Sequence, residues 1–272
     1  MPPVWLAVLA STDASRKQLR PPGLHDRSVL QDVSRPCHDG DMSRVASLLD
    51  KAVYGMAQVD YVLGLTSGTA RRWIDGYARG GRSYPPVVRE SSTGSEVVTW
   101  GEFVETRLLA EYRDAGVALV RMRPAVQRLR DELQTAYPLA SSQTWIEPEG
   151  RELVRRVQEE VSLDRRLSLV VVRTDQRMLE WSTEAREFVR STEWEETPHG
   201  PEVRRLRPSA DIAEVSLDPL VSFGEPTVRG VRTEIIAELV RAGETPDGIA
   251  EMYELPRSTV DAAVRYELMR AS

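Results

Sequence analysis

The sequence predicts an α+β fold that is mainly α-helical and built from three parts. Apolar residues recur at three- and four-residue spacing at 56–63 and again at 235–240, as in amphipathic helices. Short runs rich in β-branched and aromatic residues are concentrated between 137 and 208. We therefore expect helical domains at 42–136 and 209–272, joined by a small β-rich connecting domain at 137–208.

Composition excludes several kinds of site. The 272 residues are 41% apolar and carry a net charge of −6, so nucleic acid would need a local basic patch. One cysteine, Cys37, excludes an internal disulfide or a zinc site of several thiolates and indicates a reducing cytoplasm. The apolar run 4–10 has no preceding basic residue, and no later run reaches the roughly 18 apolar residues of a membrane span. We predict a cytoplasmic protein without membrane contact.

The N-terminal residues 1–41 are predicted to be a disordered leader. They mix Pro21, Pro22 and Pro36 with many charges and show no apolar period. A helical pattern opens at Met42, which is also a candidate translation start.

Residues 54–80 predict a helix, a turn and a second helix. Gly64 ends the first helix, Thr66 or Ser67 caps the second, and Ala70, Trp73, Ile74 and Tyr77 form its inner face. From 67 to 89 the chain carries five arginines against one acid, a local net charge of +4. Exposed basic residues are common on helices, but here the pattern and the charge agree.

A hairpin is predicted directly after these helices, from strands at 85–90 and 96–100 around a glycine-containing loop. A hairpin in this position is a wing. The segment resembles the winged-helix head of MerR-like regulators, which implies binding of double-stranded operator DNA. The candidate DNA-binding residues are Ser67, Thr69, Arg71, Arg72, Arg79, Arg82 and Arg89.

Two further helices are expected at 99–112 and 122–133, joined near Gly116. The second one pairs across a dimer axis or, alternatively, packs within its own core. In the middle domain we expect strands at 143–146, 151–154, 167–172, 177–181 and 202–207, and a helix at 183–192. This domain carries no recognisable chemistry and is interpreted as a docking or connecting sheet.

Residues 217–269 predict two turns followed by three short helices. Gly243 ends the first helix, Thr245 caps the second with Pro246 at its first position, and Val260, Ala263, Val264 and Leu268 form the stripe of the third. This is a second helix-turn-helix, whose candidate contacts are Arg257, Ser258, Thr259 and Arg265. From 228 to 272, six arginines face eight acids, so we expect protein contact rather than DNA binding.

This C-terminal segment resembles the small bacterial domain of unknown function 433. The string Val-Ser-Phe-Gly-Glu-Pro-Thr-Val-Arg-Gly-Val-Arg-Thr from Val221, continued by Ala-Gly-Glu-Thr-Pro from Ala242, carries the resemblance. Members are similar to VapB-type antitoxins, often encoded beside a PIN-domain ribonuclease toxin. The resemblance implies a homodimeric, DNA-binding antitoxin that neutralises the toxin and represses its own operon. The alternative is a stand-alone MerR-like regulator whose middle domain senses a ligand.

Nothing in the sequence favours an enzyme. His25, His38 and His199 are not spaced with a nucleophile, and no glycine-rich phosphate loop is present. Glu193, Glu195 and Glu196 read as a solvated charge run rather than a nuclease cluster. We predict no catalytic residues, no cofactor and no metal.

Overall fold

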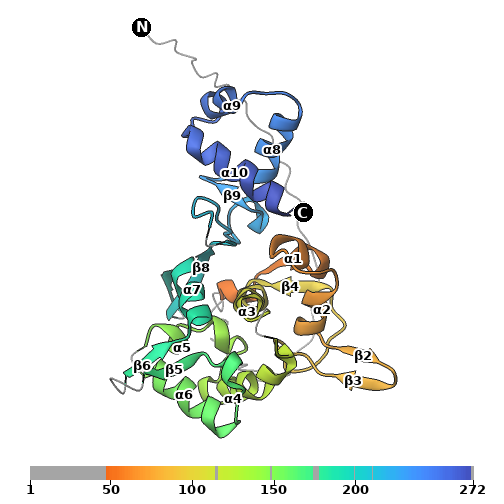
Figure 1. Cartoon of the computed structure of the whole chain (residues 1–272), viewed down its shortest axis with the longest axis vertical. Helices are drawn as coiled ribbons and strands as arrows, with labels where there is room; N and C mark the ends of the chain where they lie inside the picture. Colours follow the sequence, from red (N-terminus) through yellow and green to blue (C-terminus); the bar gives the residue numbers. More distant parts are fainter. Residues whose placement is uncertain are drawn as a thin grey trace, which may run out of the picture. The chain divides into compact units, whose positions relative to one another are not determined.

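The computed structural model describes residues 47–113, 116–147, 149–173, 178–198, 200–209 and 211–270. The expected leader 1–41, the start at Met42, Cys37 and all three histidines lie outside these residues. The described part has an α+β fold (Figure 1). Its strands form five separate two-stranded antiparallel sheets. None of its helices is long and apolar enough to cross a membrane.

The first region contains the predicted helix pair and ends in the longest helix of its core. After a short 3-10 helix, η1 (Leu48–Asp50), its elements are β1 (Ala52–Gly55), α1 (Met56–Val62), α2 (Thr69–Ile74), β2 (Tyr77–Arg79), β3 (Arg82–Tyr84), β4 (Val97–Thr99) and α3 (Trp100–Glu111). The strand β4 pairs antiparallel with β1, and β2 with β3. The helices at α1, α2 and α3 confirm the prediction from apolar spacing.

The predicted hairpin at 85–90 and 96–100 is wrong. The Val87 and Val88 amides both donate to the Trp73 carbonyl, so this run lies against the end of α2 instead of pairing as a strand. Pro85 and Pro86 before it supply no amide hydrogen for a ladder. The hairpin that follows α2 is β2–β3, whose first strand lies in the segment predicted as helix.

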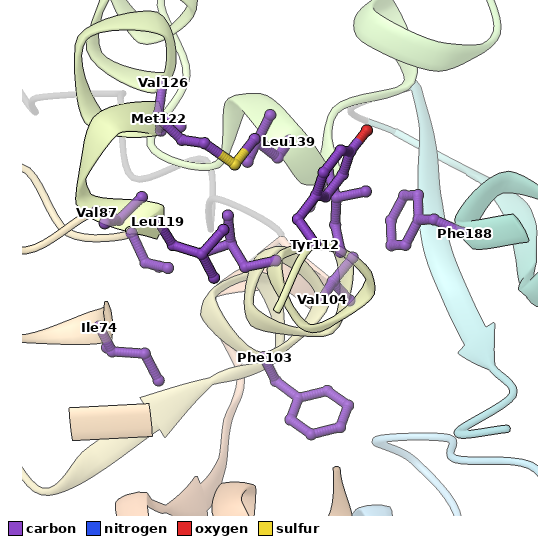
Figure 2. Close-up of a cluster of buried hydrophobic side chains, with 14 of the residues drawn as sticks. Ile74, Val87, Phe103, Val104, Tyr112, Leu119, Met122, Val126, Leu139 and Phe188 are labelled. Carbon is purple, nitrogen blue, oxygen red and sulfur yellow. The ribbon is translucent and has the colours of Figure 1, made fainter. Parts of the chain in front are cut away.

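The helix α3 is surrounded by the core. Thr99 and Glu102 form a capping box at its start, and every side chain from Trp100 to Leu109 is buried. Figure 2 shows Phe103, Val104 and Tyr112 among buried side chains from several later elements. The next helix, α4 (Arg123–Leu133), follows the 3-10 helix η2 (Leu119–Met122). Its stripe, Met122, Val126 and Leu129, is buried in this same core, so ordinary packing holds and pairing of this stripe across a dimer axis is wrong.

The middle region contains more helix than predicted. Its elements are the 3-10 helix η3 (Pro138–Ala140), α5 (Ser142–Trp145), α6 (Gly150–Glu160), the 3-10 helix η4 (Arg165–Leu167), β5 (Val170–Arg173), β6 (Met178–Trp181), α7 (Thr183–Ser191), β7 (Thr192–Thr197) and β8 (Gly200–Leu206). The predicted strands at 143–146 and 151–154 are wrong, whereas those near β5, β6 and β8 and the helix α7 are confirmed. The pairs β5–β6 and β7–β8 form two sheets, not one.

Packing explains the helix at α6. Gly150 lies so close to the Gln143 and Thr144 carbonyls that a methyl group would not fit, and Val154 and Val157 turn inward at helical spacing. Leu139, Trp145 and Phe188 belong to the same hydrophobic cluster as Phe103. One core therefore runs across the expected boundary at residue 137.

The C-terminal region has a hydrophobic core of its own. It consists of the 3-10 helix η5 (Ser222–Gly224), β9 (Thr227–Val228), β10 (Val231–Arg232), α8 (Thr233–Arg241), α9 (Pro246–Met252) and α10 (Arg257–Arg270). All three predicted helices are confirmed, and Thr245 caps α9 as expected. Leu268 was expected to point inward but is exposed; Tyr266 is buried instead, and its hydroxyl donates to the Val62 carbonyl of α1 (3.3 Å).

Candidate nucleic-acid interface

The turn between α1 and α2 is held by a buried aspartate. Asp60 of α1 accepts hydrogen bonds from the amides of Gly68 (2.6 Å) and Ala70 (2.7 Å). Gly68 is the N-cap residue of α2, in the left-handed conformation at φ 79°, and makes no side-chain cap. The expected cap by Thr66 or Ser67 is therefore wrong. A carboxylate from the preceding helix fills that role and fixes α2 against α1.

The outer face of α2 presents two exposed arginines. Arg71 forms an ion pair with Glu96, and the Arg72 guanidinium donates to the Thr69 hydroxyl (2.7 Å). Ser67 is exposed in the turn, whereas Thr69 is buried. Ala70 and Ile74 are fully buried on the opposite face, so the short helix packs against the core through this face. Of this group, Ser67, Arg71 and Arg72 are accessible to a ligand.

The hairpin β2–β3 carries the other two exposed arginines. Its turn is Gly80-Gly81 with φ of 58° and 74°, and such positive angles suit a tight two-residue hairpin turn. Arg79 lies directly opposite Arg82, and Tyr77 opposite Tyr84, with the tyrosine rings stacked at 4.5 Å. Because side chains two residues apart share a strand face, these four lie on one face. Like charges directly opposite each other are destabilising, so this face favours an anion.

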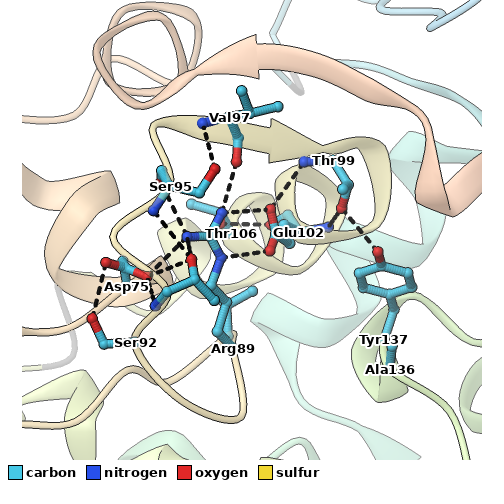
Figure 3. A network of polar contacts seen from close by, with 12 residues as sticks. Asp75, Arg89, Ser92, Ser95, Val97, Thr99, Glu102, Thr106, Ala136 and Tyr137 are labelled. Atoms are coloured by element: carbon cyan, nitrogen blue, oxygen red, sulfur yellow. Dashed lines mark hydrogen bonds and ion pairs between the residues drawn. The ribbon is translucent and has the colours of Figure 1, made fainter.

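Arg89 does not belong to that surface. Its side chain is only 8% exposed and forms ion pairs with Asp75 (2.8 Å) and Glu102 (2.6 Å), as Figure 3 shows. It also donates to the carbonyls of Ser95 (3.1 Å) and Val97 (2.7 Å). The expectation that Arg89 contacts DNA is not compatible with this burial, and Arg89 instead ties α2 to α3.

The charge state of Asp75 agrees with this role. Burial by itself opposes the charged carboxylate, but the Thr93 amide, the Arg89 guanidinium, the Ser92 hydroxyl and the Gly94 amide together hold the pKa of Asp75 well below its usual range. Asp75 is therefore ionised and pairs with Arg89 at any physiological pH.

The C-terminal candidates form no comparable basic surface. Arg257 pairs with Asp247 (2.7 Å) and Asp261 (3.1 Å), which neutralises its charge. Thr259 is buried, while Ser258 and Arg265 are exposed. Within the described ranges, no three His, Cys, Asp or Glu side chains are grouped as metal ligands.

Sequence reasoning wrongly placed Tyr77 on the inner face of a helix, whereas it is an exposed residue of β2, and it missed Tyr84 and Asp60. The two tyrosines were available from the sequence, since Tyr-Ala-Arg-Gly-Gly-Arg-Ser-Tyr has a Gly-Gly pair between short matched arms, a common hairpin signal. Asp60 had no such signal, because its capping role depends on how α1 meets α2.

These features define an α+β chain that ends in a separately cored helical domain. Residues 215–266 of that domain match the family described as "Protein of unknown function (DUF433)", which confirms the expected C-terminal domain. The whole chain belongs to the family of the Mycobacterium tuberculosis protein described as "Uncharacterized protein Rv2308". The two are 38% identical over 236 residues, which are 83% of this chain and 94% of that relative.

A solved structure shares the fold. The crystal structure of Rv2018 from Mycobacterium tuberculosis superposes with a TM-score of 0.64 at 22% identity and covers 80% of this chain and 100% of that one. At this identity the likeness concerns the fold alone.

Proposed function

We propose that this protein is a homodimeric DNA-binding antitoxin that represses its own operon and binds a PIN-domain ribonuclease toxin. In this proposal α1 and α2 form the helix-turn-helix of a MerR-like winged helix, and β2–β3 is its wing. The observation that carries the proposal is the pair of opposed arginines, Arg79 and Arg82, on an exposed hairpin directly after α2.

The electrostatics support a phosphate-binding role. Phosphate contacts supply most of the non-specific affinity for DNA. The logarithm of the binding constant falls with the logarithm of the salt concentration, and each phosphate that a cationic side chain neutralises adds about 0.9 to the size of this slope. Arg72, Arg79 and Arg82 are exposed on α2 and the hairpin, beside Arg71, which is exposed but pairs with Glu96, in a chain with a net charge of −6. DNA is therefore attracted to this surface and repelled by the net negative charge of the rest of the chain.

The antitoxin half of the proposal comes from the C-terminal domain. Residues 215–266 match the family of unknown function 433, and the resemblance of that family to VapB-type antitoxins supports a toxin-binding role. The hydrophobic core of this domain is separate from the rest, which is consistent with an independent binding domain. The neutralised Arg257 argues against a second DNA-reading surface there.

Mobility shifts on the operon's own promoter test the DNA half. Arg79→Ala/Arg82→Ala should weaken binding uniformly across sequences and lower the salt slope by about two. Arg71→Ala or Arg72→Ala should cost about 1–3 kcal/mol if the side chain reads a base edge. Arg156→Ala is the matched control, because Arg156 is also an exposed, ion-paired arginine (58%) on another helix, α6. Unchanged affinity in the Arg79/Arg82 double variant at physiological salt would contradict the assignment.

Co-expression with the protein encoded by the adjacent reading frame tests the toxin half. We expect that protein to arrest growth alone, to be neutralised by this chain, and to co-purify with it. If the protein encoded next to this chain is harmless, or remains toxic in the presence of this chain, the antitoxin function is refuted and the alternative of a regulator remains.

The alternative, a stand-alone MerR-like regulator that senses a ligand, is favoured by one cleft, which lies between α3 and α10 and not in the middle domain where the ligand was expected. It has a volume of about 410 Å³ and is lined by Arg107 of α3 and by Tyr266 and Arg270 of α10. Arg107 pairs with Glu111 and Arg270 with Glu267. Among the described residues, the Nε atoms of both arginines are nevertheless buried without a hydrogen-bond partner, which leaves a donor of each for an anion. Calorimetry with inorganic phosphate, followed by the mobility shift with and without it, tests this alternative.

A further inference from the structure

A strained turn exposes one of the three phenylalanines of the chain. Phe103 and Phe188 are fully buried, whereas Phe223 is 90% exposed. The residues Ser222, Phe223 and Gly224 have φ values of 47°, 57° and 83°, and the left-handed conformation is unfavourable for the first two. Both the backbone strain and the exposure of an apolar ring disfavour the folded state, so the stability of the chain does not explain this arrangement.

Contacts on both sides hold this turn, residues 218–225, in place. Asp218 is 1% exposed, pairs with Arg204 (3.1 Å) and accepts the Leu220 amide (2.8 Å). Gly224 lies against Val53, where a methyl group would not fit, and its carbonyl accepts the Tyr54 hydroxyl. The turn is therefore preorganised, and Phe223 is presented without a further cost in ordering the backbone.

An acidic groove lies beside the turn. Leu220, which is 58% exposed, lines this groove of about 540 Å³ together with Leu48 and Pro198. Four carboxylates and one lysine complete its charged lining: Asp50, Glu195, Glu196, Glu202 and Lys51. Glu202 is buried and accepts hydrogen bonds from Ser47 and Leu48, and Glu195 pairs with Arg204. The exposed carboxylates of Asp50 and Glu196 therefore supply the negative charge that favours a basic occupant.

We propose that Leu220 and Phe223, with the acidic groove, form the docking site for a basic amphipathic segment of a partner protein. Phe223 enters an apolar pocket of the partner, and basic side chains of the partner lie along the groove. Buried aromatic side chains at the centre of an interface contribute most of its binding energy. This inference rests on the proposed function only in taking the toxin as the first partner to be expected.

Site-specific cross-linking tests the site without assuming the toxin. A benzophenone amino acid replaces Phe223 in the full-length chain in its native host, and Met252 of α9, 58% exposed, is the matched control position. We expect one adduct at 223 and none at 252, with a partner peptide that is apolar and rich in Lys and Arg. An absent adduct, equal adducts at both positions, an acidic peptide, or an adduct to a second copy of this chain overturns the inference.

Binding of the purified partner gives the second measurement. Phe223→Asp should weaken the affinity by about 30-fold, Glu196→Lys should weaken it in a salt-dependent manner, and Met252→Asp should leave it unchanged. If the partner is not a ribonuclease and the adjacent protein is not neutralised on co-expression, this site stands and the antitoxin function fails. If the adjacent toxin binds Phe223→Asp as tightly as wild type, the antitoxin function stands and this site is wrong.

Discussion

The buried guanidinium of Arg89 makes the sharpest prediction about the architecture. Arg89→Met keeps most of the apolar stem and removes the charge that pairs with Asp75 and Glu102, whose side chains are 6% and 11% exposed. Removing one partner of a buried ion pair costs about 3–5 kcal/mol, because the other charge stays buried and uncompensated. Asp75 keeps its hydrogen bonds from the Thr93 amide, the Ser92 hydroxyl and the Gly94 amide, whereas Glu102 loses its guanidinium partner. We therefore expect a loss of about 3–4 kcal/mol.

Such a loss is a large part of the roughly 5–15 kcal/mol by which a domain is stable. For a chain of this size it corresponds to a fall in Tm of roughly 10 °C or more. Urea unfolding followed by circular dichroism measures the free energy, and thermal unfolding measures Tm.

A compensated variant separates the ion pairs from packing. Asp75→Asn and Glu102→Gln, added to Arg89→Met, remove the stranded charges, and glutamine still suits the capping box. The triple variant should be more stable than Arg89→Met alone. If instead Arg89→Met leaves stability unchanged and lowers DNA affinity, Arg89 is a DNA contact after all and the description of the network is wrong.

Three further predictions concern other parts of the chain. Burial raises the pKa of Glu105 to about 8, so the folded state holds a proton that the unfolded state releases above its ordinary pKa of roughly 4.3. The free energy of unfolding should therefore fall by about 1.4 kcal/mol per pH unit between these two values. Urea unfolding of Glu105→Gln at several pH values should lack this slope. Gly224→Ala should lower the free energy of unfolding by about 2 kcal/mol or more, because Val53 blocks the methyl group, whereas Gly230→Ala, with the same sign of φ but open space, should lose about 1 kcal/mol. A fragment 209–272 should unfold cooperatively on its own core, as calorimetry would detect, and should not shift promoter DNA at physiological salt; a shift comparable to that of the full chain would assign DNA reading to Arg257 and Ser258.

The sequence predicted helices well where one apolar stripe decided their position. The spacing at 56–63, 122–133 and 235–240 led to the correct helices because each stripe faces a core. It failed at 143–154, where short runs of Trp, Ile and Val resemble strands. There the outcome depends on the close approach of Gly150 to two carbonyls, which is a tertiary contact without a local signature.

The candidate site was predicted in part. The arginines of α2 and of the hairpin are exposed as expected, although the hairpin lies ten residues or so before the predicted wing. Arg89 was assigned to the DNA-binding surface because the local charge can be counted from the sequence, whereas its ion-pair partners cannot. Its partners are 14 and 13 residues away and become neighbours only when α2 meets α3.

The distribution of charge gives the two proposed surfaces opposite preferences. The exposed arginines of α2 and the hairpin attract phosphate, and the acidic groove beside Leu220 repels it. A basic protein segment has the reverse preference, since the opposed Arg79 and Arg82 would repel it and the exposed carboxylates of the groove would attract it. Each surface therefore rejects the ligand of the other by like-charge repulsion as well as selecting its own. Because specificity is a difference between two affinities, this separation would allow one chain of modest net charge to bind both proposed ligands, DNA and a basic partner, without exchanging their sites.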